Sequence, residues 1–233
     1  GGGGGGGRGA TALHDAAEFG RYEAAEALLE RGADVHARNR QGLTPMMLAS
    51  LLNASGPSGA GGGGGGGGAA AQGNNVLKLL LDAGSDVTAR SHPENANAFH
   101  VTARSGRVGT MRLLLEHLKD DQLEALYDAR ADGAVPLVIA AQNDRLEILE
   151  ALLEFGADPD RGTARCRALH QAAFHGHVEA MRLLIRYGAD VNLALEPEGG
   201  KGGGETPIMM AIGNDHTEAA EEGRGARPHL HRL

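Results

Sequence analysis

One short block of residues recurs along the chain and limits what the chain can fold into. It is clearest as Thr11-Ala12-Leu13-His14 and as Arg167-Ala168-Leu169-His170, each followed by one residue and two alanines. The first two copies start 33 residues apart. A period of this length is typical of an array in which small units stack on their neighbours, so we expect a core spread along the stack. The copies begin at Thr11, Thr44, Asn97, Val135, Arg167 and Thr206.

Each copy predicts two helices. A Thr at the start can accept a hydrogen bond from the first helix amides, Pro suits the first helical position, and small Ala residues let a neighbouring helix approach. Nine residues later comes a residue suited to a left-handed turn, namely Gly20, Gly106, Asp144, Gly176 or Asp215. A second helix is marked by paired apolar residues such as Leu152-Leu153, and Gly-Ala-Asp or Gly-Ser-Asp ends it.

This unit resembles the ankyrin repeat, whose signature includes a Thr-Pro-Leu-His-x-Ala start and a period near 33 residues. The resemblance covers roughly Gly9 to Glu222. It implies an all-α solenoid of helix-turn-helix units with projecting loops and one concave binding face. The expected organisation is a disordered poly-Gly leader at 1–8, repeats at 9–42, 43–94, 95–132, 133–164 and 165–203, an incomplete repeat at 204–222, and a disordered tail at 223–233.

The pattern breaks in three places. Residues 54–73 form a Gly-rich insertion that predicts a flexible coil, at a closure cost of only about 1.7 kcal/mol. Residues 118–132 lack the Gly-Ala-Asp signal and predict an added helical turn. In the sixth copy, Gly223-Arg224 stands where earlier copies have paired leucines, so we expect that copy's second apolar stripe to be missing.

Composition excludes several classes of function. Aromatic residues are 3% of the chain and Trp is absent, which favours small helices packed on helices. A net charge of −8 lacks the basic excess that nucleic acid requires. The longest apolar run, Ala134 to Ala141, is far shorter than the roughly 20 residues that cross a membrane. One cysteine, Cys166, fits a reducing compartment, so we expect a cytoplasmic protein, with the nucleus as the alternative.

The residues that could suggest chemistry have simpler interpretations. The resemblance assigns His14, His100 and His170 to helix starts, where an imidazole ties neighbouring repeats together. A zinc site needs four convergent ligands, and a single Cys cannot supply the usual set. The poly-Gly run at 61–68 follows no strand and precedes no Gly-Lys-Ser/Thr, so it predicts no phosphate loop. We therefore expect no enzyme, no metal and no cofactor.

The family's layout predicts a partner-binding face at the ends of the first helices. It exposes the residues seven and eight positions after each block start, and apolar residues there can anchor a protein partner. The alternative is that they pack against neighbouring loops. The candidates are Phe19, Leu51, Leu52, Arg104, Asn143, Phe174 and His175.

Arginines recur in the loops although the chain is acidic overall. We expect them to favour a peptide carrying Asp or Glu, through charge-assisted hydrogen bonds. The alternative is that such loops are simply basic in this family. These candidates are Arg38, Arg40, Arg90, Arg130, Arg161 and Arg165. The resemblance also makes Asn192, in Asp190-Val191-Asn192, a candidate for hydroxylation by an asparaginyl hydroxylase.

The sequence therefore predicts a non-catalytic module that binds a protein or an acidic peptide. The alternative is a recognition segment of a larger enzyme or channel, of which this chain is a fragment. We expect a monomer, with the uncapped end after the sixth block as the place where association could occur.

Overall fold

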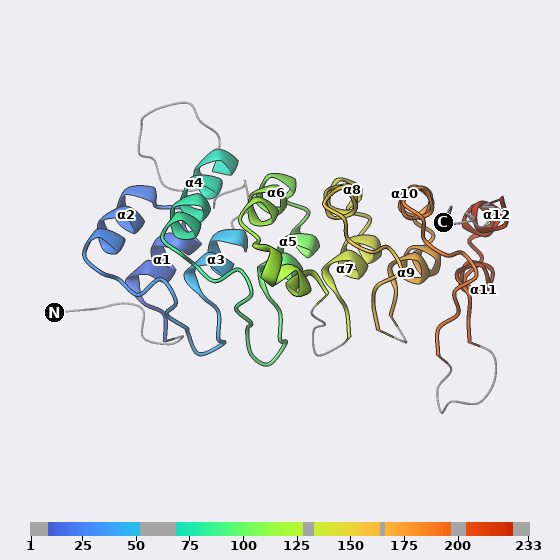
Figure 1. Ribbon diagram of the computed structural model, residues 1–233, viewed down its shortest axis with the longest axis horizontal. Coiled ribbons are helices and arrows are strands. Elements are labelled where there is room, and N and C mark those ends of the chain that lie inside the picture. The colour runs from blue at the N-terminus through green and yellow to red at the C-terminus, as the bar shows by residue number, and fades with distance from the viewer. Residues whose placement is uncertain (1–8, 52–68, 128–132, 164–165, 197–203, 226–233) are drawn as a thin grey trace. The chain divides into compact units, whose positions relative to one another are not determined.

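The computed structural model describes residues 9–51, 69–127, 133–163, 166–196 and 204–225. Helices make up almost all of the regular structure in these ranges, and the one extended pairing there is an isolated bridge between Thr163 and Cys166 (Figure 1). The elements are α1 (Ala12–Glu18), α2 (Tyr22–Glu30), α3 (Pro45–Leu51), α4 (Ala69–Asp82), α5 (Ala98–Ser105), α6 (Val108–Glu116), the 3-10 helix η1 (Asp120–Leu126), α7 (Pro136–Gln142), α8 (Leu146–Glu154), α9 (Ala168–His175), α10 (Val178–Arg186), α11 (Pro207–Gly213) and α12 (Thr217–Gly225).

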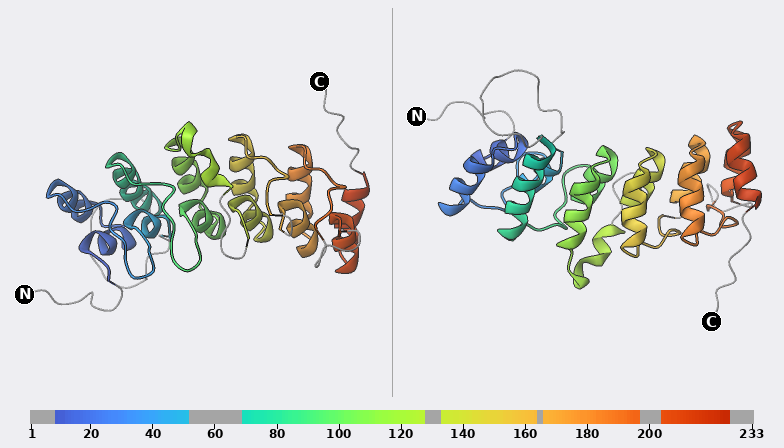
Figure 2. Two further views of the ribbon diagram at one scale, coloured as in Figure 1. Left: turned by 60° about the horizontal axis from the view of Figure 1, so that its bottom comes forward. Right: turned by 90° about the horizontal axis from the view of Figure 1, so that it is seen from above.

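Contacts divide the chain into two units. The first comprises residues 1–105 and 109–125, and the second comprises residues 106–108 and 126–233. In the first unit, α3 packs between α1 and α5 in one layer, while α2 and α4 lie side by side in another (Figure 2). In the second unit, α7, α9 and α11 form one layer and α8, α10 and α12 form the other. This confirms the predicted all-α fold of stacked helix pairs.

Small side chains set the spacing of the first helices. Ala168, Ala172 and Ala173 of α9 have no exposed surface, because α7, α10 and α11 surround that helix. Leu184 of α10 is equally buried, and a leucine buried in this way contributes about 1.5–3 kcal/mol. The core of each unit is thus the series of junctions between helix pairs.

The left-handed turns after the first helices are confirmed. Backbone φ angles are 65° at Gly20, 73° at Gly106, 51° at Asp144, 71° at Gly176 and 59° at Asp215. Gly176 is required for a second reason. A Cβ atom there would lie 2.7 Å from Nδ1 of His216, the turn residue of the next helix pair.

Histidines tie two of the first helices to the following loop, as the resemblance implied for His14 and His170. Nδ1 of His14 accepts a hydrogen bond from the Thr11 N–H at 3.1 Å, so its Nε2–H donates to the Leu43 carbonyl at 2.9 Å. Nε2 of His170 makes the equivalent bond to the Glu205 carbonyl at 3.1 Å. Its Nδ1 is buried without a hydrogen-bond partner, and Arg167 stands where the first block has Thr11.

The predicted boundaries of the irregular segments are partly corrected. The added turn after α6 is present as η1. The insertion at 54–73 is not all coil, since α4 begins at Ala69, where an Ala-Ala-Ala-Gln run has high helix propensity. The leader at 1–8, the rest of the insertion before Ala69, and residues 226–233 lie outside the described residues.

The sixth block has a second helix, α12, although it lacks the paired leucines of the earlier copies, as expected. In α12, Ala219 and Ala220 are 1% and 4% exposed, and Gly223 lies so close to Ile208 that a Cβ atom would be 2.6 Å from Ile208 Cγ1. Small residues let α12 approach α11 without paired leucines.

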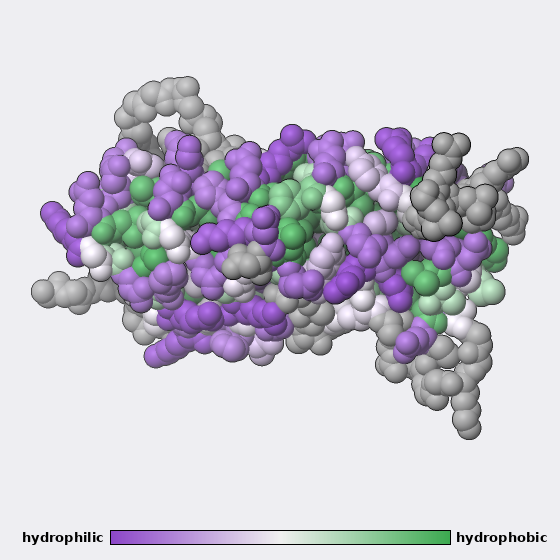
Figure 3. Space-filling model, viewed as in Figure 1, coloured by the Kyte–Doolittle hydropathy of each residue, from purple (hydrophilic) through white to green (hydrophobic). Residues whose placement is uncertain are grey.

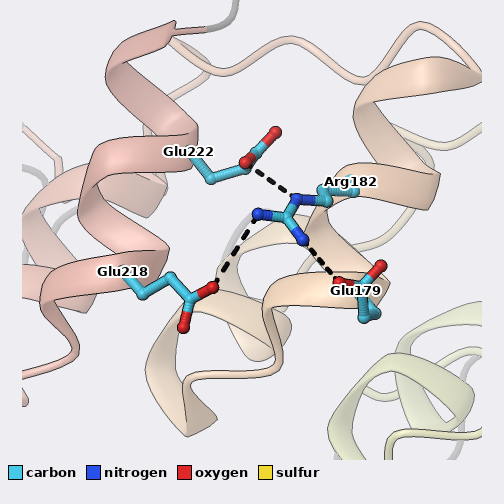
Figure 4. A network of polar contacts seen from close by, with 4 residues as sticks. All are labelled: Glu179, Arg182, Glu218 and Glu222. Atoms are coloured by element: carbon cyan, nitrogen blue, oxygen red, sulfur yellow. Dashed lines mark hydrogen bonds and ion pairs between the residues drawn. The ribbon is translucent and has the colours of Figure 1, made fainter.

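Ion pairs also hold α12 in place. Arg182 of α10 binds Glu222 of α12 at 3.0 Å and Glu218 at 3.8 Å, as well as Glu179 of its own helix at 2.5 Å (Figure 4). Single exposed ion pairs stabilise proteins little, but one guanidinium shared by three carboxylates forms a network between the two helices.

The unpaired His170 ring nitrogen yields a stability prediction. In the first block, the Thr11 hydroxyl lies 2.8 Å from Nδ1 of His14. Arg167→Thr should supply the same hydroxyl to His170 and make the protein about 1 kcal/mol more stable than Arg167→Ala, which removes the same arginine without adding a hydroxyl. Chemical denaturation measures the difference. Equal stability of the two variants would show that the hydroxyl does not reach the ring.

A second prediction concerns acid. Burial lowers the pKa of His170 from its ordinary value of about 6.5, against the opposing effect of its bond to the Glu205 carbonyl. The unfolded chain therefore binds this proton more readily, so the stabilisation from neutral His170 is complete above about pH 6.5 and is lost as the pH falls. The melting temperature should drop less between pH 7 and pH 5 in His170→Gln than in the wild type. His36→Gln, at an exposed histidine, should keep the wild-type pH dependence.

Candidate functional site

Large apolar side chains are exposed at the ends of the first helices. Phe19 is 54% exposed after α1, Leu51 is 36% exposed at the end of α3, and Phe174 is 42% exposed in the last turn of α9. Each comes one or two residues after the last buried small residue of its helix, which is Ala17, Ser50 or Ala173. Each unit therefore has exposed apolar side chains at the ends of its first helices.

In the first unit these side chains have basic neighbours. The guanidinium carbon of Arg21 lies 5.3 Å from the centre of the Phe19 ring, a cation–π contact. Arg104 is exposed near the end of α5. Leu52, which was predicted to accompany Leu51, lies outside the described residues.

In the second unit, Phe174, His175, His177 and His216 form what we call the phenyl–imidazole cluster. The Phe174 and His175 rings meet edge to face at 5.0 Å, and His175 stacks on His177 at 5.6 Å. Nε2 of His177 bonds to the Gln142 carbonyl at 3.2 Å, and Nε2 of His216 bonds to the Phe174 carbonyl at 3.1 Å. Burial, together with His177 and His216, lowers the pKa of His175, so its imidazole is neutral at pH 7.

Asn143 is exposed beside this cluster but is partly committed to its own helix. Its side-chain amide donates a hydrogen bond to the Ile139 carbonyl at 2.8 Å and so caps the end of α7. A partner would therefore find less of this side chain available than the sequence alone implied.

The loops bring some of the predicted arginines together. Arg38 is exposed, and its Nη1 donates to the Arg90 carbonyl of the next loop at 2.7 Å. Arg40 and Arg90 are exposed in the same unit. In the second unit, Arg161 is exposed, with its guanidinium 4.7 Å from the centre of the Tyr127 ring. Arg130 and Arg165 lie outside the described residues.

The loop aspartates are turned toward their own backbone. Asp34, Asp86, Asp158 and Asp190 each accept a hydrogen bond at 2.9 Å from the N–H two residues further along. These hydrogen bonds hold the four carboxylates against their own turns, beside the exposed arginines of the loops. Asn192 is exposed in one such turn, and its hydroxylation stays a prediction.

The described residues give no sign of a metal centre, since no group of three or more His, Cys, Asp or Glu side chains is placed to hold an ion. Cys166 is half-buried and bridges to Thr163. Within the same ranges, no helix has the length and apolarity needed to cross a membrane.

Two exposed residues of α11 were missed at the sequence level. Met209 is 59% exposed and Ile212 is 50% exposed, and apolar surface shows among hydrophilic surface in this part of the second unit (Figure 3). A comparison of the copies could have found them, because Met209 stands where other blocks have His14 or His170, and Ile212 stands where they have Ala or Ser.

Comparison with known proteins places these features in a family. The family model described as ankyrin repeats in three copies matches residues 68–163 and 137–222, and the model described as ankyrin repeats in many copies matches residues 4–49. The chain is similar in fold to the ankyrin repeat domain of Bcl-3, with a TM-score of 0.74 and 22% identity over 94% of this chain and 86% of that one.

Similar curated sequences are longer proteins. A Caenorhabditis elegans homologue of transient receptor potential cation channel subfamily A member 1 is 26% identical over 90% of this chain and 15% of its own length. The probable E3 ubiquitin-protein ligase XBOS33 of rice (Oryza sativa subsp. japonica) is 30% identical over 80% of this chain and 33% of its own length. Because ankyrin repeat models match well over half of the residues, this chain belongs to the ankyrin repeat family.

Proposed function

We propose that this chain is a non-catalytic interaction module that binds a peptide or a folded protein through the ends of its first helices and its loop tips. Ankyrin repeats are protein–protein interaction modules. The observation that carries the proposal is the exposure of Phe19, Leu51 and Phe174 at the ends of the first helices of three blocks. Exposed aromatic and aliphatic side chains on a rigid helical frame are typical anchors for a protein partner.

The partner carries acidic residues opposite the loops of the first unit. Arg38, Arg40 and Arg90 are exposed there, while Asp34 and Asp86 accept hydrogen bonds from their own turns. A carboxylate approaching these loops would gain charge-assisted hydrogen bonds. Apolar anchors would supply most of the affinity, and the arginines would orient an acidic segment and speed its association.

The second candidate is a recognition segment of a longer enzyme or channel. The chain spans a third or less of the length of the curated relatives it matches, which supports this alternative. In that case the same surfaces would bring a substrate or regulator to an activity located elsewhere in the longer protein. The full-length transcript discriminates between the two candidates.

The first test compares two exposed phenylalanines of the second unit. Phe174 is 42% exposed in the phenyl–imidazole cluster, and Phe155 is 40% exposed after α8. Phe174→Ser should weaken binding of a partner recovered by affinity purification by about tenfold or more, since anchors of this kind contribute about 2 kcal/mol. Phe155→Ser is the matched control. Equal loss of affinity in both variants, measured by calorimetry, would place the partner elsewhere.

The second test reverses the charge of the loops. Arg38→Glu with Arg40→Glu should weaken binding mainly by slowing association and should reduce its dependence on salt. Lys78→Glu with Arg186→Glu makes the same charge change at exposed helix residues and should have little effect. If the two double variants bind alike, net charge accounts for the attraction and the loops have no special part in it.

A further inference from the structure

Residues that are buried in the other repeats are exposed at one end of the second unit. Three positions after the block start, Val138 and His170 are 0% and 1% exposed, because another helix pair packs on them. The equivalent Met209 is 59% exposed. Six positions after the start, Ala141 and Ala173 have no exposed surface, whereas Ile212 is 50% exposed. Within the described ranges, no other helix pair packs on this α11 face, which carries larger side chains than the buried junctions do.

The complementary face is open on α1 and α2 in the first unit. In the fifth block, Ala168, Ala180 and Leu184 have no exposed surface. Their equivalents Ala12 and Ala24 are exposed and Leu28 is half-buried. A groove of about 420 Å³ is found here. It is lined by Ala12, Asp15, Ala16, Arg21, Ala24, Ala27, Leu28 and Arg31.

We propose that the α11–α12 end of one copy of this chain docks on the α1–α2 groove of a second copy, in the register that stacks neighbouring repeats within each unit. Met209 of the first copy then faces the residue just before Thr11 of the second, and Ile212 lies against the alanines of the groove. Large side chains on one end match small ones on the other, which is the size complementarity of a packed junction. The association is head to tail, because the two surfaces differ.

Charge at the turn supports a second copy as the occupant. Within the second unit, one contact recurs between the turns of neighbouring blocks. The residue ten positions after a block start lies over the turn residue of the preceding block, which is nine positions after that block's own start. His216 lies over Gly176 in this way, and Arg145 lies over Gly106, where a Cβ atom would be 2.9 Å from Arg145 Cδ. In the proposed register Arg21 reaches Asp215, which is exposed in its left-handed turn. The two ends of the chain therefore carry opposite charges at this contact.

One pair of like charges weakens the junction and provides a test of the register. Arg182 lies fifteen positions after its block start and binds Glu218, twelve positions after the next start. The equivalent residues across the proposed junction are Glu221 and Glu23. These two carboxylates repel each other, so association should be weak and should depend on concentration. Glu221→Arg would convert the repulsion into an ion pair like the one in Figure 4.

The first experiment uses two variants that each keep one open end. Met209→Glu with Ile212→Glu blocks the α11 face, and Ala12→Glu with Ala24→Glu blocks the groove. All four positions are exposed, and circular dichroism checks that the variants fold. In sedimentation velocity, the wild type should form a concentration-dependent series of species. Each variant alone should be monomeric, and their mixture should give a 1:1 dimer with nothing larger.

The second experiment adds Glu221→Arg to the variant with the blocked groove. Association with the α11-blocked partner should then tighten about tenfold, as one repulsive pair becomes attractive. Adding Glu23→Arg to that partner should remove the gain. A mixture that stays monomeric even with Glu221→Arg, or that forms species larger than the dimer, would overturn the proposal. Phe174→Ser should associate like the wild type, so this result is independent of the proposed function.

Discussion

The fold depends on each helix pair burying its apolar side against the next pair. No pair has enough apolar surface to be stable alone, and the chain has few large side chains with which to build a central core. Packing of the core therefore depends on alanines such as Ala172 and Ala173, whose small size lets neighbouring first helices approach closely. Imidazoles such as His14 add a directional bond to the following loop, so that packing and hydrogen bonding select the same register.

In this arrangement, the side chains that stabilise the fold differ from those that are exposed for a partner. Side chains between neighbouring pairs are committed to stacking, and loop aspartates are committed to their own turns. The ends of the first helices and the loop arginines are exposed at the surface instead. They can differ from one ankyrin repeat protein to another at little cost in stability, which suits a surface that selects a partner.

The sequence predicted the helix pairs, the left-handed turns and the two histidine bridges, because each depends on residues close together or repeated at one offset. It did not predict that α12 would form without paired leucines. A second helix without paired leucines forms there because Gly223 lets it approach Ile208, and because Arg182 reaches Glu218 and Glu222 from the preceding pair. Both contacts join residues of different helices, so no local sequence pattern predicts them.

The candidate surfaces also combine features that the sequence predicted with features that only the structure shows. The sequence by itself determined which positions end the first helices, and hence that Phe19 and Phe174 would lie at the ends of the first helices of their blocks. Only the tertiary structure decided that Arg21 covers Phe19, that Arg38 is tied to the Arg90 carbonyl, and that Met209 and Ile212 are exposed. The physical reason is that helix periodicity and turn conformation are set by neighbouring residues, whereas exposure and pairing depend on which other segment of the chain is packed alongside.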